Sequence, residues 1–153
     1  MYERLQEAIE WSAKRHRGQY RDGERGLPYV THPIEVVIAL RTVGGETDED
    51  LLVVAALHDV LEETDATPKA IRKRFGERVE ALVVELTRWE PSDAEREGLT
   101  DEEVYALRNG ALLQEIQAFG PEAMRVKLAD RFCNMRESNR TRVGVKLSRY
   151  VKQ

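Results

Sequence analysis

Apolar positions recur along most of this chain with the spacing of an α-helix, and polar positions occupy the opposite faces. Seven helical segments are expected, bounded by glycine, proline or capping side chains: 2–17, 33–43, 47–61, 67–76, 77–87, 100–119 and 121–137. A short helix is also expected after Thr141. The chain has no strong strand pattern and no internal repeat. We therefore expect an all-α fold, a helical bundle that forms a single domain over residues 1–153.

Helix boundaries follow from a few residues with a known local effect. Thr31 is expected to cap the second helix, with Pro33 in its first turn. Thr100 and Glu103 have the spacing of a capping box. The stretch 89–99 is polar and contains proline and glycine, so it is expected to be the most mobile loop.

The end of the third segment raises a chemical question. Residues 51–57 are apolar on every side of a helix, so this helix should be buried. Buried ionised side chains are costly unless they are paired or bind a metal, and neighbouring carboxylates repel each other unless a cation lies nearby. A cavity holding a cation is therefore predicted at this helix end. The apolar run is followed by four ionisable residues: His58, Asp59, Glu62 and Glu63.

The predicted helix 121–137 is apolar except for one stripe. A stripe of two cations, one carboxylate and one amide is typical of a pocket wall for an anionic ligand, and its carboxylate could bind a metal. The residues of the stripe are Lys127, Asp130, Arg131 and Asn134.

A further histidine, His32, lies in a stiff loop between Pro28 and Pro33. With His58, Asp59 and Asp130 it would form a site of mixed nitrogen and oxygen ligands. Such a site suits Mn²⁺, Fe²⁺ or Zn²⁺ better than Ca²⁺. Open coordination positions would hold water or substrate.

Composition excludes several classes of protein. The net charge is −4, so we expect no broad basic face for duplex nucleic acid. Cys133 is the single cysteine, which excludes an intrachain disulfide. The N-terminus lacks the pattern of a signal peptide, and no apolar run reaches the roughly 20 residues that span a bilayer. We expect a cytoplasmic protein without a membrane partner, and no pattern specifies its oligomeric state.

The histidines and aspartates resemble the H…HD…D pattern of the HD-domain metal-dependent phosphohydrolases. The resemblance covers about residues 11–139 and is closest to the hydrolase domain of RelA/SpoT alarmone enzymes, in particular the small stand-alone hydrolases such as the metazoan SpoT homologue. Four motifs carry it: GQYRDGERGLPYVTHP, ALHDVLEET, FGERVEALVVELT and VKLADRFCNMR.

The resemblance implies an all-helical hydrolase that binds one Mn²⁺. It implies hydrolysis of the 3′-pyrophosphate of ppGpp or pppGpp, which releases pyrophosphate and GDP or GTP. The implied metal ligands are His32, His58, Asp59 and Asp130. The implied water-handling pair is Glu62 and Glu63, and the implied substrate contacts are Asn134 and Arg21 at the nucleoside and Lys127 and Arg131 at the phosphates.

Two departures keep rival functions open. Glu63 stands where the family usually has aspartate, and the loop after Arg21 is longer. An HD phosphohydrolase acting on another nucleotide or phosphoester is one alternative, and a non-catalytic nucleotide sensor with a relic metal site is another. Purely structural roles are also possible for the site residues, such as a solvated helix end for the two glutamates. His16, on the apolar face of the first helix, is expected to be a hydrogen-bonded residue of the core or pocket rim.

Overall fold

Helix α3 (Glu49–Leu57) lies at the centre of the protein, because every side chain from Leu51 to Leu57 is buried. The computed structural model describes residues 2–21 and 26–141, so the helix expected after Thr141 lies outside the described residues. Four helices pack around α3. They are α1 (Glu3–Arg15), α2 (Thr31–Thr42), α6 (Glu77–Leu86) and α9 (Pro121–Thr141).

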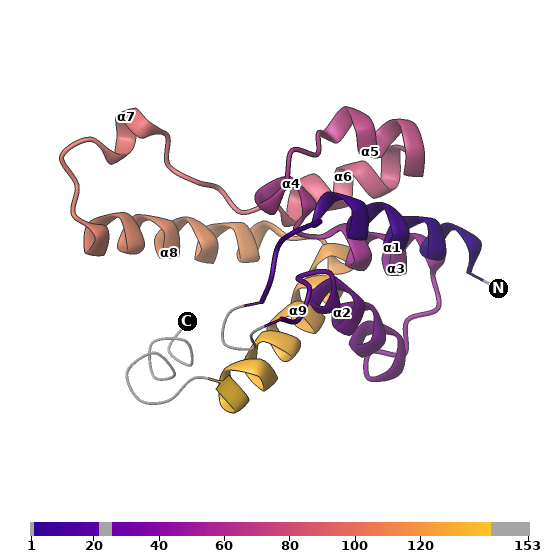
Figure 1. Ribbon diagram of the computed structural model, residues 1–153. Helices are drawn as coiled ribbons and strands as arrows, with labels where there is room; N and C mark the ends of the chain where they lie inside the picture. The colour runs from indigo at the N-terminus through magenta and orange to yellow at the C-terminus, as the bar shows by residue number, and fades with distance from the viewer. Residues whose placement is uncertain (1, 22–25, 142–153) are drawn as a thin grey trace.

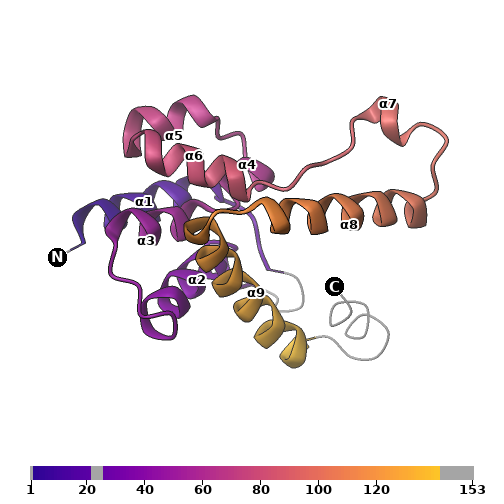
Figure 2. The same ribbon diagram turned by 180° about the vertical axis from the view of Figure 1, so that it is seen from behind.

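The remaining helices lie outside this central group. They are α4 (Val60–Glu63), α5 (Pro68–Phe75), α7 (Asp93–Arg96) and α8 (Asp101–Ala118). Helix α5 packs against α6, whereas α7 and α8 extend away from the other helices (Figures 1 and 2). Among the described residues the regular elements are all helical, apart from one isolated bridge between Tyr20 and Pro28. The predicted all-α fold is confirmed.

Several helix boundaries follow from the capping residues. Thr67 accepts a hydrogen bond from the backbone N–H of Ala70 at the start of α5. Gly76 ends that helix with a φ of +96°, a conformation that side chains disfavour. The capping box of Thr100 and Glu103 at the start of α8 is confirmed.

The prediction for the start of α2 is wrong. The helix begins at Thr31, and the Thr31 hydroxyl donates to the Pro28 carbonyl instead of capping the helix. The loop predicted at 89–99 contains the short helix α7.

The prediction of an unbroken third helix to Leu61 is also wrong. Helix α3 ends at Leu57, and α4 begins after Asp59. His58 Nδ1 lies 2.9 Å from the carbonyl oxygen of Ala55, so the side chain satisfies one of the carbonyls left free at a helix end. The break therefore places His58 and Asp59 at a junction between two helices.

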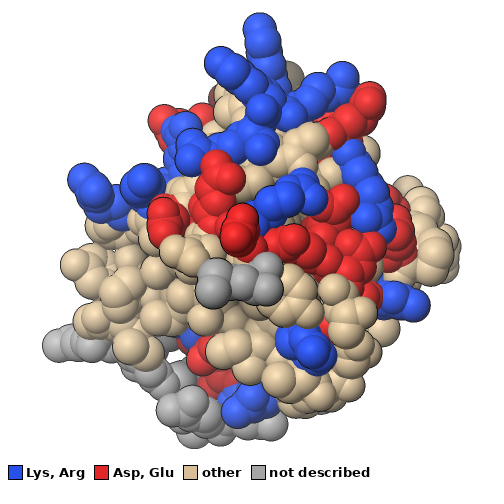
Figure 3. Space-filling view, turned by 90° about the vertical axis from the view of Figure 1, so that its right-hand side faces the viewer, with Lys and Arg blue, Asp and Glu red and all other residues tan. Residues whose placement is uncertain are grey.

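Charged residues are separated on the surface. On the face shown in Figure 3, Lys and Arg gather at the upper edge, where α5 lies, and Asp and Glu form a band below. The last turn of α5 is basic, with Arg72, Lys73 and Arg74. Within the described ranges, no helix combines the length and the apolar character needed to cross a membrane.

Candidate metal centre

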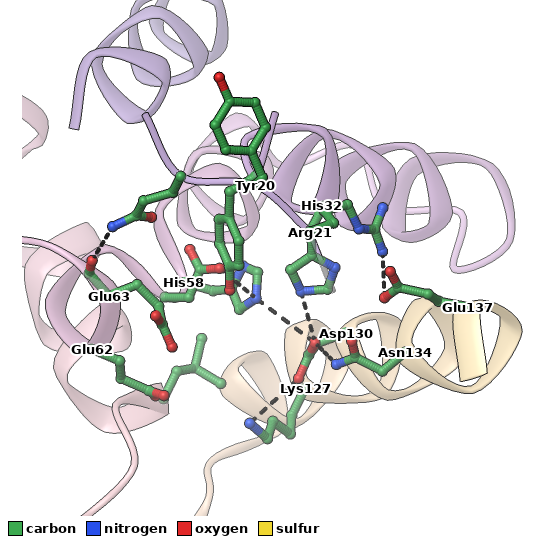
Figure 4. Close-up of a pocket in the computed structure, with 14 residues that line it drawn as sticks. Tyr20, Arg21, His32, His58, Glu62, Glu63, Lys127, Asp130, Asn134 and Glu137 are labelled. Carbon is green, nitrogen blue, oxygen red and sulfur yellow. Dashed lines mark hydrogen bonds and ion pairs between the residues drawn. The ribbon is translucent and has the colours of Figure 1, made fainter. Parts of the chain in front are cut away.

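A cavity of about 600 Å³ lies where α2, the α3–α4 junction and α9 meet (Figure 4). Arg131 is not among its lining residues, because one step along α9 from Asp130 turns the side chain by about 100°. The structure brings together the other predicted site residues around this cavity: Arg21, His32, His58, Asp59, Glu62, Glu63, Lys127, Asp130 and Asn134.

Four buried side chains converge at one end of this cavity. Ligand atoms of His32, His58 and Asp59 all lie within 4.8 Å of one another. Asp130 Oδ1 is 3.3 Å from His32 Nε2 and 3.8 Å from His58 Nε2. The four residues come from α2, the helix junction and α9, and each is at most 7% exposed. The fold thus collects two imidazoles and two carboxylates from distant parts of the sequence.

The polar atoms of this cluster fit a divalent cation. Both carboxylate oxygens of Asp59, and Nδ1 of His32, are buried without a hydrogen-bond partner among the described residues. His58 Nδ1 donates to the Ala55 carbonyl, which leaves the Nε2 lone pair facing the cluster. Imidazole and carboxylate ligands together suit a borderline divalent ion.

The two aspartates are held in the ionised form. Burial raises the pKa of Asp59. The effects of His58 and His16 in the opposite direction are larger, so the net pKa lies below the ordinary value. Burial likewise raises the pKa of Asp130, and His32 and His58 outweigh this effect, so its pKa is also low. Ionised carboxylates at neutral pH are the form that binds metals.

Two other polar residues of α9, Lys127 and Asn134, contact Asp130. Asn134 Nδ2 donates to Asp130 Oδ1, and Lys127 Nζ lies 3.4 Å from Asp130 Oδ2. Asn134 therefore orients a carboxylate of the cluster. Lys127, with its side chain 18% exposed, places a positive charge on the cavity wall.

The two glutamates of α4 line the same cavity. Glu62 Oε1 accepts a hydrogen bond of 2.8 Å from the backbone N–H of Arg88. Solvent reaches Glu62 through the cavity, but the surrounding protein atoms still raise the pKa of its carboxyl, and the Arg88 N–H opposes that shift in part. Glu63 also lines the cavity, and its backbone carbonyl accepts from Gln19 Nε2. The cavity thus contains a carboxylate with a raised proton affinity close to the ligand cluster.

Arg21 lines the cavity but is already paired. Its Nη1 lies 2.8 Å from Glu35 Oε2, and its Nη2 lies 2.7 Å from Glu137 Oε2. The two carboxylates hold this buried guanidinium against α2 and α9 at the rim of the cavity.

Two residues beside the cluster were not predicted as site residues. His16 is buried, and its Nε2 lies 3.4 Å from Asp59 Oδ1. The prediction that it lies in the core or at the pocket rim did not include this contact. Tyr29 stacks on His16 with ring centroids 4.8 Å apart, and burial followed by the charge of Asp59 raises its pKa. Its position three residues before His32, in the same motif, is the signal that could have identified it.

The family model described as HD domain matches residues 8–151. The human guanosine-3′,5′-bis(diphosphate) 3′-pyrophosphohydrolase MESH1 is 37% identical over 138 residues, which are 89% of this chain and 70% of the relative. The Drosophila melanogaster protein of that name is 33% identical over 134 residues, covering 88% of this chain and 69% of the relative. The Aquifex aeolicus guanosine-3′,5′-bis(diphosphate) 3′-pyrophosphohydrolase is 41% identical over 86 residues, which cover 56% of this chain and 12% of the relative.

Solved structures with a similar fold include the following two. One is described as a metazoan ortholog of SpoT that hydrolyses ppGpp; it has a TM-score of 0.78, 30% identity, and coverage of 95% of this chain and 77% of the other. The second, lmo0812 from Listeria monocytogenes, has a TM-score of 0.54, 29% identity, and coverage of 74% and 64% respectively.

Proposed function

Because this chain belongs to the HD-domain family, with 3′-pyrophosphohydrolases among its relatives, we propose that it hydrolyses the 3′-pyrophosphate of ppGpp and pppGpp. The products would be pyrophosphate and GDP or GTP. One observation carries the proposal: two imidazoles and two carboxylates converge, buried, in the same cavity as the Glu62–Glu63 pair. A nucleotide sensor would need only the cavity, not a carboxylate with a raised proton affinity beside a ligand cluster.

We assign Mn²⁺ as the cation, held by four residues. When bound, such a cation lowers the pKa of a water molecule and places positive charge beside the scissile phosphate. The unpartnered oxygens of Asp59 support this assignment, since a buried carboxylate needs a compensating charge. The four proposed ligands are His32, His58, Asp59 and Asp130.

Glu62 is the proposed general base. The Arg88 N–H fixes one carboxylate oxygen and leaves the other to accept the proton of the attacking water. The water oxygen bonds to the phosphorus attached to the 3′-oxygen, and the bond between that phosphorus and the 3′-oxygen breaks. Pyrophosphate leaves, and the 3′-oxygen takes up a proton as a hydroxyl group. Glu63, on the same helical turn, is assigned to hold the water in place.

The substrate contacts follow from the cavity wall. Lys127 is assigned to the pyrophosphate, because its ammonium group neutralises charge that develops as the bond breaks. Arg21 and Asn134 are assigned to the nucleoside side of the cavity, and Arg131 is omitted because it does not line the cavity. We further propose that residues 1–153 act as one catalytic domain in the cytoplasm, where the free thiol of Cys133 stays reduced.

The test is product identification with a panel of substrates. Purified protein with Mn²⁺ is incubated separately with ppGpp, pppGpp, GTP and GDP, and the products are separated by anion exchange. Equimolar GDP and pyrophosphate from ppGpp, with GTP and GDP left intact, is the expected result. Cleavage of another nucleotide alone would refute the alarmone assignment, and ppGpp binding without cleavage would identify a sensor.

A further inference from the structure

A chain of side-chain contacts runs from the end of α4 to Asp59. The carbonyl oxygen of Glu63 can only accept a hydrogen bond, so the Gln19 group facing it must be the amide nitrogen, at 2.5 Å. The amide oxygen of Gln19 therefore faces His16, and His16 Nδ1 lies 2.7 Å from it. An amide oxygen only accepts, so His16 Nδ1 carries the hydrogen of this bond.

The other ring nitrogen of His16 faces Asp59. Nε2 of His16 lies 3.4 Å from Asp59 Oδ1. The second oxygen of Asp59, Oδ2, lies on the opposite side, 3.9 Å from His58 Nε2. The two oxygens of Asp59 thus have separate surroundings, one facing His16 and the other facing the ligand cluster.

His16 has little freedom to turn away from Asp59. The residue is 2% exposed, and its ring stacks on Tyr29. Its backbone is fixed as well. Its N–H donates to the backbone carbonyl of Ser12 near the end of α1, and its own carbonyl accepts from the backbone N–H of Gln19. A ring that is held on all sides can hold a neighbouring carboxylate.

We propose that His16 is a positioning residue for Asp59, and that Gln19 orients His16. This role rests on the proposed metal site, in which Asp59 binds the cation. Outer residues of this kind commonly change metal affinity about 10–100-fold when they are removed. His16 fixes the direction of Asp59 Oδ2, and Gln19 links that direction to the position of α4, which carries both glutamates.

The test measures metal binding without substrate. Apo protein is titrated with Mn²⁺ by calorimetry, and with Co²⁺ by visible absorption, which reports the ligand geometry. His16→Ala is expected to weaken Mn²⁺ binding about 10–100-fold and to change the Co²⁺ spectrum. His16→Gln is expected to recover most of the affinity, because its amide nitrogen can donate to Asp59 Oδ1.

Ser12→Ala is the matched control, since Ser12 is buried in the last part of α1, just before His16, and does not line the cavity. It should leave Mn²⁺ affinity and the Co²⁺ spectrum unchanged. If His16→Ala does not fold, Gln19→Ala replaces it, because Gln19 is only partly buried and its loss frees the His16 ring.

The outcomes separate this inference from the proposed function. Wild-type Mn²⁺ affinity in both His16→Ala and Gln19→Ala, with ppGpp still cleaved, overturns the positioning role and leaves the function intact. Wild-type protein that binds no Mn²⁺ refutes the metal site and the inference with it. Weaker binding in the His16 and Gln19 variants, with normal binding in Ser12→Ala, establishes the positioning role whatever the substrate.

Discussion

At the scale of single residues, the chemistry depends on where each ionisable group is fixed. Glu62 and Glu85 are both glutamates that accept a hydrogen bond from a backbone N–H, of Arg88 and Gly120 respectively. Only Glu62 of these two lines the cavity. Comparing variants of these two glutamates therefore tests the proposed catalytic role of Glu62 against a purely structural one.

Glu62→Gln should lower kcat for ppGpp by about 10²–10⁴-fold, the usual contribution of a general base. The amide still fits the cavity, so bound Mn²⁺ per chain should stay the same. Glu85→Gln, the matched control, should keep the wild-type kcat. Loss of Mn²⁺ in Glu62→Gln would contradict the assigned role, because Glu62 would then be a metal ligand.

The raised pKa of Glu62 predicts the acid side of the pH profile. A general base works when it is deprotonated, so kcat/KM should fall as the pH drops through the pKa of Glu62. Because that pKa is raised, the fall should be centred above pH 4.5, the ordinary value for glutamate. Initial rates in Mn²⁺ buffers of different pH test this. A profile that stays flat down to pH 4.5 would contradict the assignment.

The residues of the buried cluster could be predicted from the sequence, but the contacts that surround them could not. A histidine and an aspartate after a fully apolar helix need a partner, and the family motifs indicate which partners. The role of His16 depends on the contact between α1 and the helix junction. Nothing in the spacing of His16 and Asp59 along the chain encodes that contact.

At the scale of elements, the junction between α3 and α4 decides the geometry of the site. The apolar pattern continues through Val60 and Leu61, so sequence periodicity predicts one helix. The break depends on the His58 side chain bonding to Ala55, a local competition that periodicity does not register. Helix α2 shows the same effect, because its start depends on the contact between Thr31 and Pro28.

Glu46 connects the α2–α3 loop to α9. Its carboxylate accepts from the backbone N–H groups of Thr47 and Asp48 and pairs with Arg125 at 2.7 Å. These hydrogen bonds lower the pKa of Glu46, and the bond from the Asp48 backbone N–H has the largest effect. Glu46→Gln should therefore reduce the free energy of unfolding by about 1–2 kcal/mol at pH 7.

A lowered pKa means that this stabilisation is present above the pKa of the unfolded chain and is lost as the pH falls through the folded value. The difference between Glu46→Gln and wild type should therefore shrink between pH 5 and pH 3. Urea unfolding at both pH values measures it. Glu80→Gln, which removes a pair with the exposed Arg72, should cost less than Glu46→Gln at pH 7.

At the scale of the whole molecule, the cavity forms where α2 and α9 pack against the end of α3. His32 and Asp130 lie almost a hundred positions apart, yet their side chains are 3.3 Å apart. The family motifs in the sequence indicate which residues lie close together in the fold. The packing of α2 and α9 against α3 explains why these residues meet. The extension of α7 and α8 away from the other helices has no signature in the sequence pattern (Figure 1).

Metal binding should therefore stabilise the fold as a whole. At a free Mn²⁺ concentration 100 times Kd, the free energy of unfolding should rise by about 2.7 kcal/mol. Asp59→Asn keeps the shape of the side chain and removes its charge, so it should abolish this gain. Thermal unfolding with Mn²⁺ and with chelator measures the effect. An equal gain in Asp59→Asn would place the metal elsewhere.

The most direct measurement is the rate of pyrophosphate release from ppGpp as Mn²⁺ is added stepwise to metal-free protein. The rate should rise in proportion to bound Mn²⁺, level off at one ion per chain, and return to the baseline with chelator, with GDP formed in equal amount. Two results would contradict the assignment as a metal-dependent alarmone hydrolase. One is protein that is fully loaded with Mn²⁺ and leaves ppGpp intact; the other is pyrophosphate release that continues unchanged when chelator is added.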